Sequence, residues 1–545
     1  MALRPISDIA DDLGLRPDER VVRRPGVLKV PVKSVRDRVR PSRRGKLVLV
    51  TAMTPTPHGE GKTVTTIGLS MGLHRLGKKS VLCLRQPSLG PVFGIKGGAA
   101  GAGRSTVEPS TAINLGFTGD ADAVASSHNL LAALIDNHIF HGNAIGINPE
   151  RVFWPRTLDC EDRALRNVRV GLEEVKASVP RSSGFIIAAA SEMMAVLGLA
   201  KDYPDLKRRL GRIVVAERKD GSPVRADDLK GTGSLAALMR DALEPNLVQT
   251  AEGTPALVHG GPFGNIAHGT ASRMSIDLAL YSADYALVEV GFGSDLGCEK
   301  FVDLLAPYSD LSADAAVIVA TVKALRFHGG EGVSGETDRL KLLRVGLDNL
   351  LQHVENVKRF GLPAVIALNK FADDTPEEIA EVRAFGATHG VPVEISEAFT
   401  QGGKGTEALA DRVIELAARG HHSHPLYAPG TPIPVALDQV VMGAYGGDGA
   451  TLTATAQEDL ARLTRWGETD GPVCIAKTAL SLSDDPKVRG RPKGFRLKID
   501  RLIRSAGAEF TVAQVGRISL MPGLPSVPAA ERISLDDDGT IRGVL

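Results

Sequence analysis

The strongest constraint on the fold is a glycine-rich segment near the N-terminus, Thr56-Pro57-His58-Gly59-Glu60-Gly61-Lys62-Thr63. It follows a short apolar run, Leu47–Val50, typical of a buried parallel strand. After it, apolar residues recur at helical spacing until Gly77. A glycine-rich turn between a strand and a helix that carries Lys-Thr predicts a phosphate-binding loop. In such a loop backbone amides and Lys62 face the anion and Thr63 ligates Mg²⁺. A strict P-loop has glycine where Thr56 stands, so this loop is a variant.

Short apolar runs alternate with helical periods along the following chain. This alternation predicts an α/β protein whose mostly parallel sheet is covered by helices on both faces, as in P-loop nucleotide hydrolases. Ligands of such sheets collect at the carboxyl ends of the strands, where glycine-containing polar loops recur here. The runs are 47–50, 81–84, 185–190, 257–259, 286–290, 316–320 and 365–368.

Arg85 is the most informative residue in these loops, because it directly follows the run 81–84. Strand, P-loop, helix and strand form a right-handed unit, so Lys62 and Arg85 are expected at the same sheet edge. Two cations there suit a phosphoryl centre, and an arginine offers a planar fork for carboxylate or phosphate. The alternative is that Arg85 is a surface ion-pair partner.

Composition excludes several classes of protein. The 545 residues contain 65 Lys and Arg against 64 Asp and Glu, without the basic excess of a nucleic-acid-binding protein. The four cysteines are far apart, as expected of a reducing cytoplasm rather than a zinc or disulfide scaffold. No apolar stretch is long enough to span a bilayer, and the acidic N-terminus does not read as a signal peptide. We therefore expect a cytoplasmic protein without nucleic-acid or membrane partners.

The length predicts more than one structural unit. We expect a P-loop nucleotide domain over residues 1–360, a second α/β domain over 361–445 and a C-terminal α+β module over 446–545.

Long strings of residues, in order along almost the whole chain, resemble the formate–tetrahydrofolate ligase family, also called 10-formyltetrahydrofolate synthetases. The matching strings are 54–63, 84–101, 158–166, 259–269, 291–301, 472–478 and 521–530. Several long strings in the right order are far more specific than a P-loop alone.

The resemblance implies an ATP-dependent carbon–nitrogen ligase that works in two steps. Formate attacks the γ-phosphate of MgATP to give formyl phosphate, and N10 of tetrahydrofolate then takes the formyl group. Residues 56–63 would bind ATP, with Lys62 on the phosphates and Thr63 on Mg²⁺, and Arg85 would hold formyl phosphate. The family also implies a homotetramer stimulated by a monovalent cation, K⁺ or NH₄⁺.

The resemblance places flat rings, folate or adenine, against Phe371, Ala372 and Phe399. The family has proline where Ala372 stands and tryptophan where Phe399 stands. Phenylalanine can still stack, but with less area and no indole N–H, so folate affinity is the property we expect to differ. A further departure is Glu509, at a position where the family commonly has a small residue.

Two other interpretations of the sequence remain open at this point. One is a related P-loop enzyme that activates another carboxylate or uses another acceptor. The other is a nucleotide-switched binding ATPase, although such proteins carry an additional lysine early in the P-loop. Formate dependence of ATP turnover separates a ligase from a switch.

Overall fold

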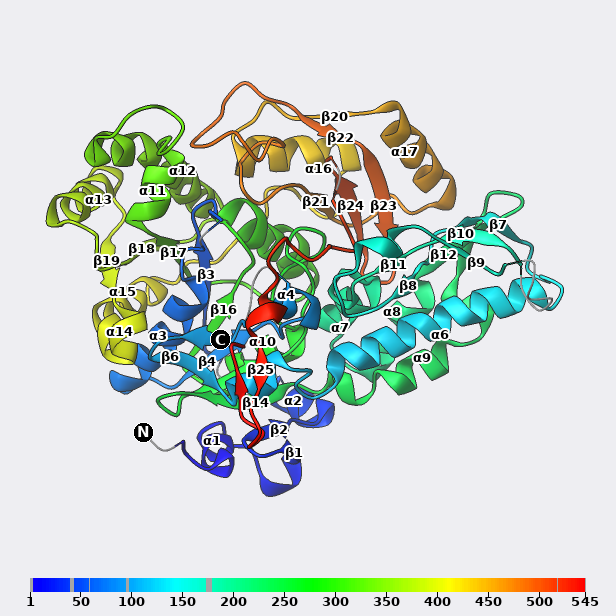
Figure 1. Cartoon of the computed structure of the whole chain (residues 1–545), viewed down its shortest axis with the longest axis horizontal. Helices are drawn as coiled ribbons and strands as arrows, with labels where there is room; N and C mark the ends of the chain where they lie inside the picture. The colour runs from blue at the N-terminus through cyan, green and yellow to red at the C-terminus, as the bar shows by residue number, and fades with distance from the viewer. Residues whose placement is uncertain are drawn as a thin grey trace.

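The computed structural model describes residues 3–39, 44–57, 59–94, 98–172, 179–516 and 518–544. The chain forms a mixed α/β structure around a large, mostly parallel sheet (Figure 1). The sheet order is β1-β2-β14-β15-β4-β16-β3-β17-β18-β19, with β6 beside β14 and β5 beside β6. From β15 to β19 in this order all neighbours are parallel, whereas β1, β2, β14 and β6 pair antiparallel.

The strands of this sheet are β1 (Val21–Arg24), β2 (Val27–Lys29), β3 (Lys46–Ala52), β4 (Ser80–Leu84), β5 (Gly101–Ala102), β6 (Ser105–Glu108), β14 (Asn246–Thr250), β15 (Pro255–Val258), β16 (Tyr285–Glu289), β17 (Ala315–Ala320), β18 (Ala364–Asn369) and β19 (Val393–Ser396). The helices before residue 230 are α1 (Ile6–Asp12), α2 (Val32–Arg38), α3 (Lys62–Arg75), α4 (Leu89–Phe93), α5 (Ser110–Asn114), α6 (Asp120–Phe140), α7 (Glu192–Leu199) and α8 (Tyr203–Arg212). The later helices are α9 (Thr232–Leu238), α10 (Arg273–Ser282), α11 (Val322–His328), α12 (Arg339–Arg359), α13 (Pro376–His389), α14 (Ala398–Gln401), α15 (Glu407–Ala417), α16 (Ile433–Val440) and α17 (Ala454–Trp466).

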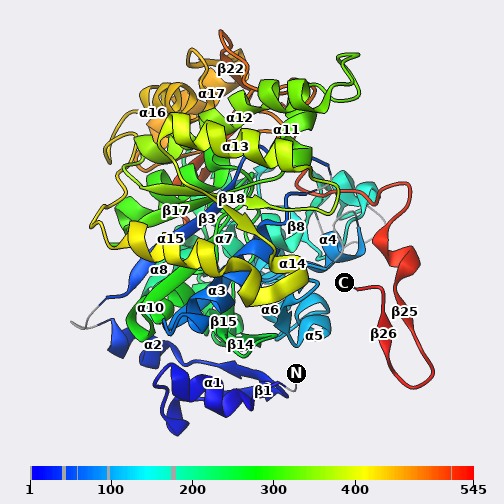
Figure 2. The same cartoon turned by 90° about the vertical axis from the view of Figure 1, so that its left-hand side faces the viewer.

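The central strands are buried on both faces: successive side chains of a strand point to opposite faces, and every residue of β4, β16, β17 and β18 is buried. In β3, Leu47 and Leu49 belong to one apolar cluster while Val48 and Val50 belong to another. The first cluster includes side chains of α10 and α12, which cover one face of the sheet. The second cluster includes side chains of α3 and α15, which cover the other face. Helices therefore cover both faces, as the alternating pattern predicted, and Figure 2 shows α3 and α15 beside the strands.

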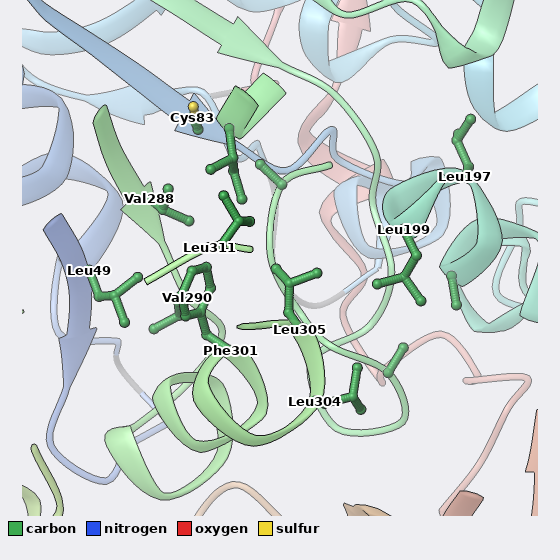
Figure 3. Close-up of a cluster of buried hydrophobic side chains, with 14 of the residues drawn as sticks. Leu49, Cys83, Leu197, Leu199, Val288, Val290, Phe301, Leu304, Leu305 and Leu311 are labelled. Carbon is green, nitrogen blue, oxygen red and sulfur yellow. The ribbon is translucent and has the colours of Figure 1, made fainter. Parts of the chain in front are cut away.

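The first cluster extends beneath the carboxyl edge of the sheet (Figure 3). There Leu49 and Val290 meet Phe301 and Leu305, on the π-helical segment Phe301–Leu305. Leu199 of α7 belongs to the same cluster. This packing fixes the loop after β16, which the functional site uses.

Two further regions flank the sheet in Figure 1. One is an excursion between α6 and α9, whose strands are β7 (Ile147–Val152), β8 (Arg156–Thr157), β9 (Val168–Val170), β10 (Arg181–Ser183), β11 (Phe185–Ile186), β12 (Val214–Arg218) and β13 (Pro223–Arg225). The other is a C-terminal module with strands β20 (Ala450–Leu452), β21 (Val473–Ala476), β22 (Leu497–Ile499), β23 (Arg501–Ser505) and β24 (Phe510–Gln514). The hairpin of β25 (Ser534–Leu535) and β26 (Ile541–Arg542) follows it. Among the described residues, no helix combines the length and the hydropathy that a membrane crossing requires.

The sequence prediction is wrong for the run 185–190. Only Phe185–Ile186 is a strand, β11, and it pairs with β8 outside the central sheet. Ala188–Ala190 forms a 3₁₀ turn that leads into α7. A short apolar run does not distinguish a strand from other buried backbone, and three consecutive alanines have little preference for strands. The strand β14, which pairs with β15 in the central sheet, was missed because its ends, Asn246 and Thr250, are polar.

The expected boundary at 360/361 falls between β17 and β18, which are hydrogen-bonded neighbours in the central sheet. The β18 and β19 loops thus emerge at the same edge as the P-loop.

Candidate active site

The P-loop connects β3 to α3, as predicted. Gly61 precedes the helix in the left-handed region, with φ of 70°, and α3 begins at Lys62. A Cβ at Gly61 would lie 2.3 Å from Nδ2 of Asn369, so both conformation and space require glycine there. The first amides of α3 and the positive end of its dipole are therefore directed to this edge.

Lys62 lies against the loop that follows β16. Its ammonium donates hydrogen bonds to the carbonyl oxygens of Val290 and Phe292, the latter at 2.9 Å. Phe292 itself has a φ of 60°, an uncommon conformation for a bulky residue. The ammonium is thus held at the carboxyl ends of the two adjacent strands β3 and β16.

Arg85 approaches the same loop from β4, on the other side of β16. Its Nη1 donates to the carbonyl of Pro262 at 3.3 Å, and a Cβ added at Gly291 would lie 3.5 Å from its Nη2. Burial lowers the pKa of Arg85, and the negative charge of Glu289 opposes that shift. An arginine remains charged even so, because its ordinary pKa is far above neutrality. Lys62, at the start of α3, and Arg85, directly after β4, therefore converge on residues 290–292.

Lys300 adds a cation that the sequence analysis did not single out. It is fully buried and its ammonium donates to the carbonyl of Gly264 at 2.7 Å, in the loop that Arg85 also contacts. The preceding residue, Glu299, is also buried, and burial together with repulsion by Asp303 raises its pKa well above the ordinary value. Burial likewise raises the pKa of Asp303 to about 7, although Asp303 accepts the backbone N–H of Leu426 at 2.7 Å. The pair therefore carries less than two negative charges at neutral pH.

Glu60 folds back into the P-loop. Its carboxylate accepts the N–H of Thr56 at 2.7 Å, and burial raises its pKa while that hydrogen bond and the charge of Lys62 oppose the shift. Pro57 and Gly59 are exposed at the tip of the loop, and the predicted contact of His58 lies outside the described residues. Thr63 is half-buried as the second residue of α3, the position whose hydroxyl ligates Mg²⁺ in P-loops.

The three residues predicted to stack rings lie at the far end of the same edge. Phe371 and Ala372 follow β18, and Phe399 lies on α14, just after β19. Phe371 is 43% exposed and Phe399 is 54% exposed, unusually high values for phenylalanine. The backbone of Phe399 is anchored, since its carbonyl accepts the N–H of Arg104 at 2.8 Å. Two exposed aromatic rings on fixed backbone are available to a planar ligand.

Asn369 connects the two ends of this edge and was missed by the sequence analysis. It is the last residue of β18 and is buried, and its Nδ2 donates to the carbonyl of Glu60 at 3.1 Å. The next residue, Lys370, pairs with Glu397 at 3.2 Å. Asn369 therefore fixes the P-loop relative to the strand that carries Phe371. Only its place directly after the apolar run 365–368 could have indicated this role.

Glu509, unexplained from the sequence, is an anchor between regions. It lies in the turn before β24 with a φ of 66° and makes ion pairs with three arginines of α8. The distances are 2.7 Å to Arg208, 3.0 Å to Arg209 and 3.0 Å to Arg212. Its pKa is lowered by these arginines in spite of burial.

Comparison with known proteins decides between the interpretations of this edge. The family model of formate–tetrahydrofolate ligases matches residues 1–545. The chain belongs to this family. It is 48% identical over 542 residues to the formate–tetrahydrofolate ligase of Thermus thermophilus, covering 99% of this chain and 98% of that protein. It is 48% identical over 548 residues to the formate–tetrahydrofolate ligase of Symbiobacterium thermophilum, covering 100% of this chain and 98% of that protein. The resemblance seen in the sequence is thereby confirmed, and the chain is a ligase rather than a nucleotide-switched binding protein.

Proposed function

We propose that this chain performs its family's reaction, the ATP-dependent ligation of formate to tetrahydrofolate, on the edge formed by the loops after β4, β16, β3 and β18. The products are 10-formyltetrahydrofolate, ADP and phosphate. The observation that supports this location is the convergence of Lys62 and Arg85 on residues 290–292 from opposite sides of β16.

In the first step an oxygen of formate attacks the γ-phosphorus of ATP. The bond from that phosphorus to the β,γ-bridging oxygen breaks, ADP leaves, and formyl phosphate remains. Such a transfer requires alignment and charge stabilisation rather than covalent help from the protein. Residues 56–63, which connect β3 to α3, would hold the triphosphate, Lys62 would neutralise its charge, and Thr63 would ligate the Mg²⁺ that arrives with ATP.

In the second step the lone pair of N10 attacks the formyl carbon. The tetrahedral species collapses with loss of phosphate, and N10 gives up its proton. Arg85 balances negative charge on the phosphate in both steps, since its planar fork matches phosphate oxygens and its burial strengthens the interaction.

The rings occupy the exposed end of the edge. Phe371 and Phe399 offer faces to adenine or the pterin, and Ala372 leaves open the space beside Phe371. We also propose that the protein acts as a homotetramer stimulated by K⁺ or NH₄⁺. Light scattering of the purified protein, and activity with each cation replaced by tetramethylammonium, test these two points.

The decisive experiment omits each substrate in turn. Product that requires MgATP, formate and tetrahydrofolate together establishes the ligase, and its acid-formed methenyl derivative is measured by absorbance. The intermediate is tested separately with hydroxylamine, a trap for acyl phosphates. Formohydroxamate that forms from MgATP and formate without folate supports formyl phosphate. Its absence, with normal ligation, would exclude a free-standing first step.

A further inference from the structure

A buried network of hydrogen bonds connects the segment before the P-loop to the loop after β16 through α12. Lys62 joins the P-loop to the same loop, since its ammonium donates to the carbonyl groups of Val290 and Phe292. At the centre of the network is His353, a fully buried residue of α12. Burying a polar side chain is costly unless hydrogen bonds compensate, so the partners of His353 show what it holds in place.

The ring of His353 contacts both segments. Its Nε2 lies 2.9 Å from Oγ1 of Thr54, and its Nδ1 lies 2.8 Å from Oγ of Ser294. Thr54 stands between the end of β3 and the P-loop, and Ser294 begins the π-helical segment Ser294–Cys298. The ring also packs closely against Gly293, where an added Cβ would lie 2.9 Å from Cε1 of His353. A single side chain thus fixes the foot of the P-loop relative to the loop that holds the Lys62 ammonium.

The other partners of the two hydroxyl groups indicate where the ring carries its proton. Asn349 donates to Oγ1 of Thr54 at 2.9 Å, and Asn356 donates to Oγ of Ser294 at 3.2 Å. With the proton on Nδ1, the ring donates to Ser294 and accepts the hydroxyl proton of Thr54. The hydroxyl proton of Ser294 then points to the carbonyl of His353, at 3.5 Å. Burial lowers the pKa of His353 to about 4, so at neutral pH the ring is uncharged and can both donate and accept.

The loop after β16 is held from the C-terminal module as well. Asp295, the neighbour of Ser294, forms an ion pair at 3.3 Å with the ammonium of Lys477, and both side chains are buried. Lys477 directly follows β21. The loop therefore has one anchor in the module and another at His353, and only the second of these also reaches the segment before the P-loop.

We propose that His353 is a positioning residue for phosphoryl transfer. It fixes residues 290–294 relative to the P-loop, so that the carbonyl groups of Val290 and Phe292 keep the Lys62 ammonium where the γ-phosphate arrives. His353 itself contacts no substrate and acts through Lys62. This inference rests on the proposed function. Because a misplacement of about 1 Å at a reacting centre can cost about 10²-fold in rate, the effect is expected in kcat. The KM for tetrahydrofolate is expected to stay unchanged, since the proposed ring contacts follow β18 and β19.

His353→Asn and His353→Gln test this bridge. The shorter amide of asparagine can replace Nδ1 toward Ser294, and the longer amide of glutamine can replace Nε2 toward Thr54. Each variant therefore keeps one contact and loses the other. We expect both to lower kcat about tenfold or more, because holding the two segments together requires both contacts. Steady-state assays with ATP, formate and tetrahydrofolate varied in turn give kcat and each KM.

His128→Asn is the matched control. His128 is also fully buried, with Nδ1 2.9 Å from Oγ of Ser191 and Nε2 2.9 Å from the carbonyl of Pro155, but it belongs to α6. This control should lower the unfolding temperature about as much as the His353 variants do, because it too removes hydrogen bonds of a buried imidazole. Its kcat is expected to stay at the wild-type value. Circular dichroism confirms that each variant is folded.

Hydrogen–deuterium exchange provides a signal that does not require ligation. Both His353 variants are expected to exchange the amides of residues 290–298 faster than wild type, and His128→Asn is not. The proposal is overturned if both His353 variants keep the wild-type kcat, if exchange at 290–298 is unchanged, or if His128→Asn lowers kcat equally. A wild-type protein that makes no 10-formyltetrahydrofolate would overturn the proposed function instead, and the exchange rates would still decide whether His353 fixes the loop.

Discussion

The two ends of the proposed catalytic edge, a phosphate end and a ring end, are built differently. At the phosphate end, the buried strands β3, β4 and β16 present Lys62, Arg85 and backbone amides from fixed loops. At the ring end, Phe371 and Phe399 follow the outer strands β18 and β19 and stand exposed at 43% and 54%. The cations proposed to bind phosphate are therefore embedded in the core, whereas the proposed ring contacts are side chains that can change without disturbing it. Two of the three departures from the family that the resemblance indicates, Ala372 and Phe399, fall at the proposed ring end; the third, Glu509, lies against α8.

The largest effect is expected at the phosphate end. Arg85→Ala removes a buried charge from the reacting centre, and we expect kcat/KM to fall about 10²–10³-fold with the fold retained. Arg85→Lys should rescue little, because an ammonium lacks the planar fork. Steady-state assays with formate and folate varied in turn provide the measurement. Arg75→Ala, which removes an exposed ion pair with Glu407, is the control. Normal turnover of Arg85→Ala would remove this residue from the mechanism.

The contact between the two ends is expected to come second. Asn369→Asp replaces a donor to the carbonyl of Glu60 by an acceptor. The hydrogen bond that holds the P-loop against the end of β18 is then lost. We expect the KM for ATP to rise about tenfold, with the KM for formate unchanged. Lys370→Ala, which removes only the exposed pair with Glu397, is the matched control. An equal rise in every KM would indicate general loss of structure instead.

A smaller change is expected at the ring end. Phe399→Ala removes a stacking face, and the KM for tetrahydrofolate should rise about two- to tenfold while kcat changes little. Phe399→Trp should lower that KM, because it restores the larger ring of the family. If the KM for ATP changes instead, Phe399 serves adenine; if neither changes, the pterin lies elsewhere.

The sequence predicted the features that depend on residues close together in the chain, and it missed contacts between residues far apart in the chain. Lys62 and Arg85 were placed correctly at one edge because their position follows from strand order and handedness, which short motifs reveal. The contacts of Asn369 with Glu60 and of Glu509 with Arg208 join residues about 300 positions apart, and no local pattern encodes them. The run 185–190 was misplaced for a related reason, since its alanines lie against α6 and α7 and not in the central sheet. The domain boundaries and the roles of the site residues remain predictions.

The smallest effect concerns stability and again contrasts the two ends. Beneath the phosphate end, the pKa of Asp303 is raised to about 7 beside Glu299, while at the ring end Glu397 is an exposed partner of Lys370. A carboxyl whose folded pKa is raised binds its proton more tightly in the folded state, so its stabilising contribution is lost as pH rises from its ordinary value through about 7. Asp303→Asn keeps an oxygen for the N–H of Leu426 and cannot ionise. Thermal unfolding should show this variant gaining stability relative to wild type as pH rises from 6 to 8. Glu397→Gln should shift the unfolding temperature little at either pH, because exposed ion pairs contribute at most about 1 kcal/mol. If the unfolding temperature of Glu397→Gln depended on pH as strongly as that of Asp303→Asn, the two ends would not differ in the burial of their charges.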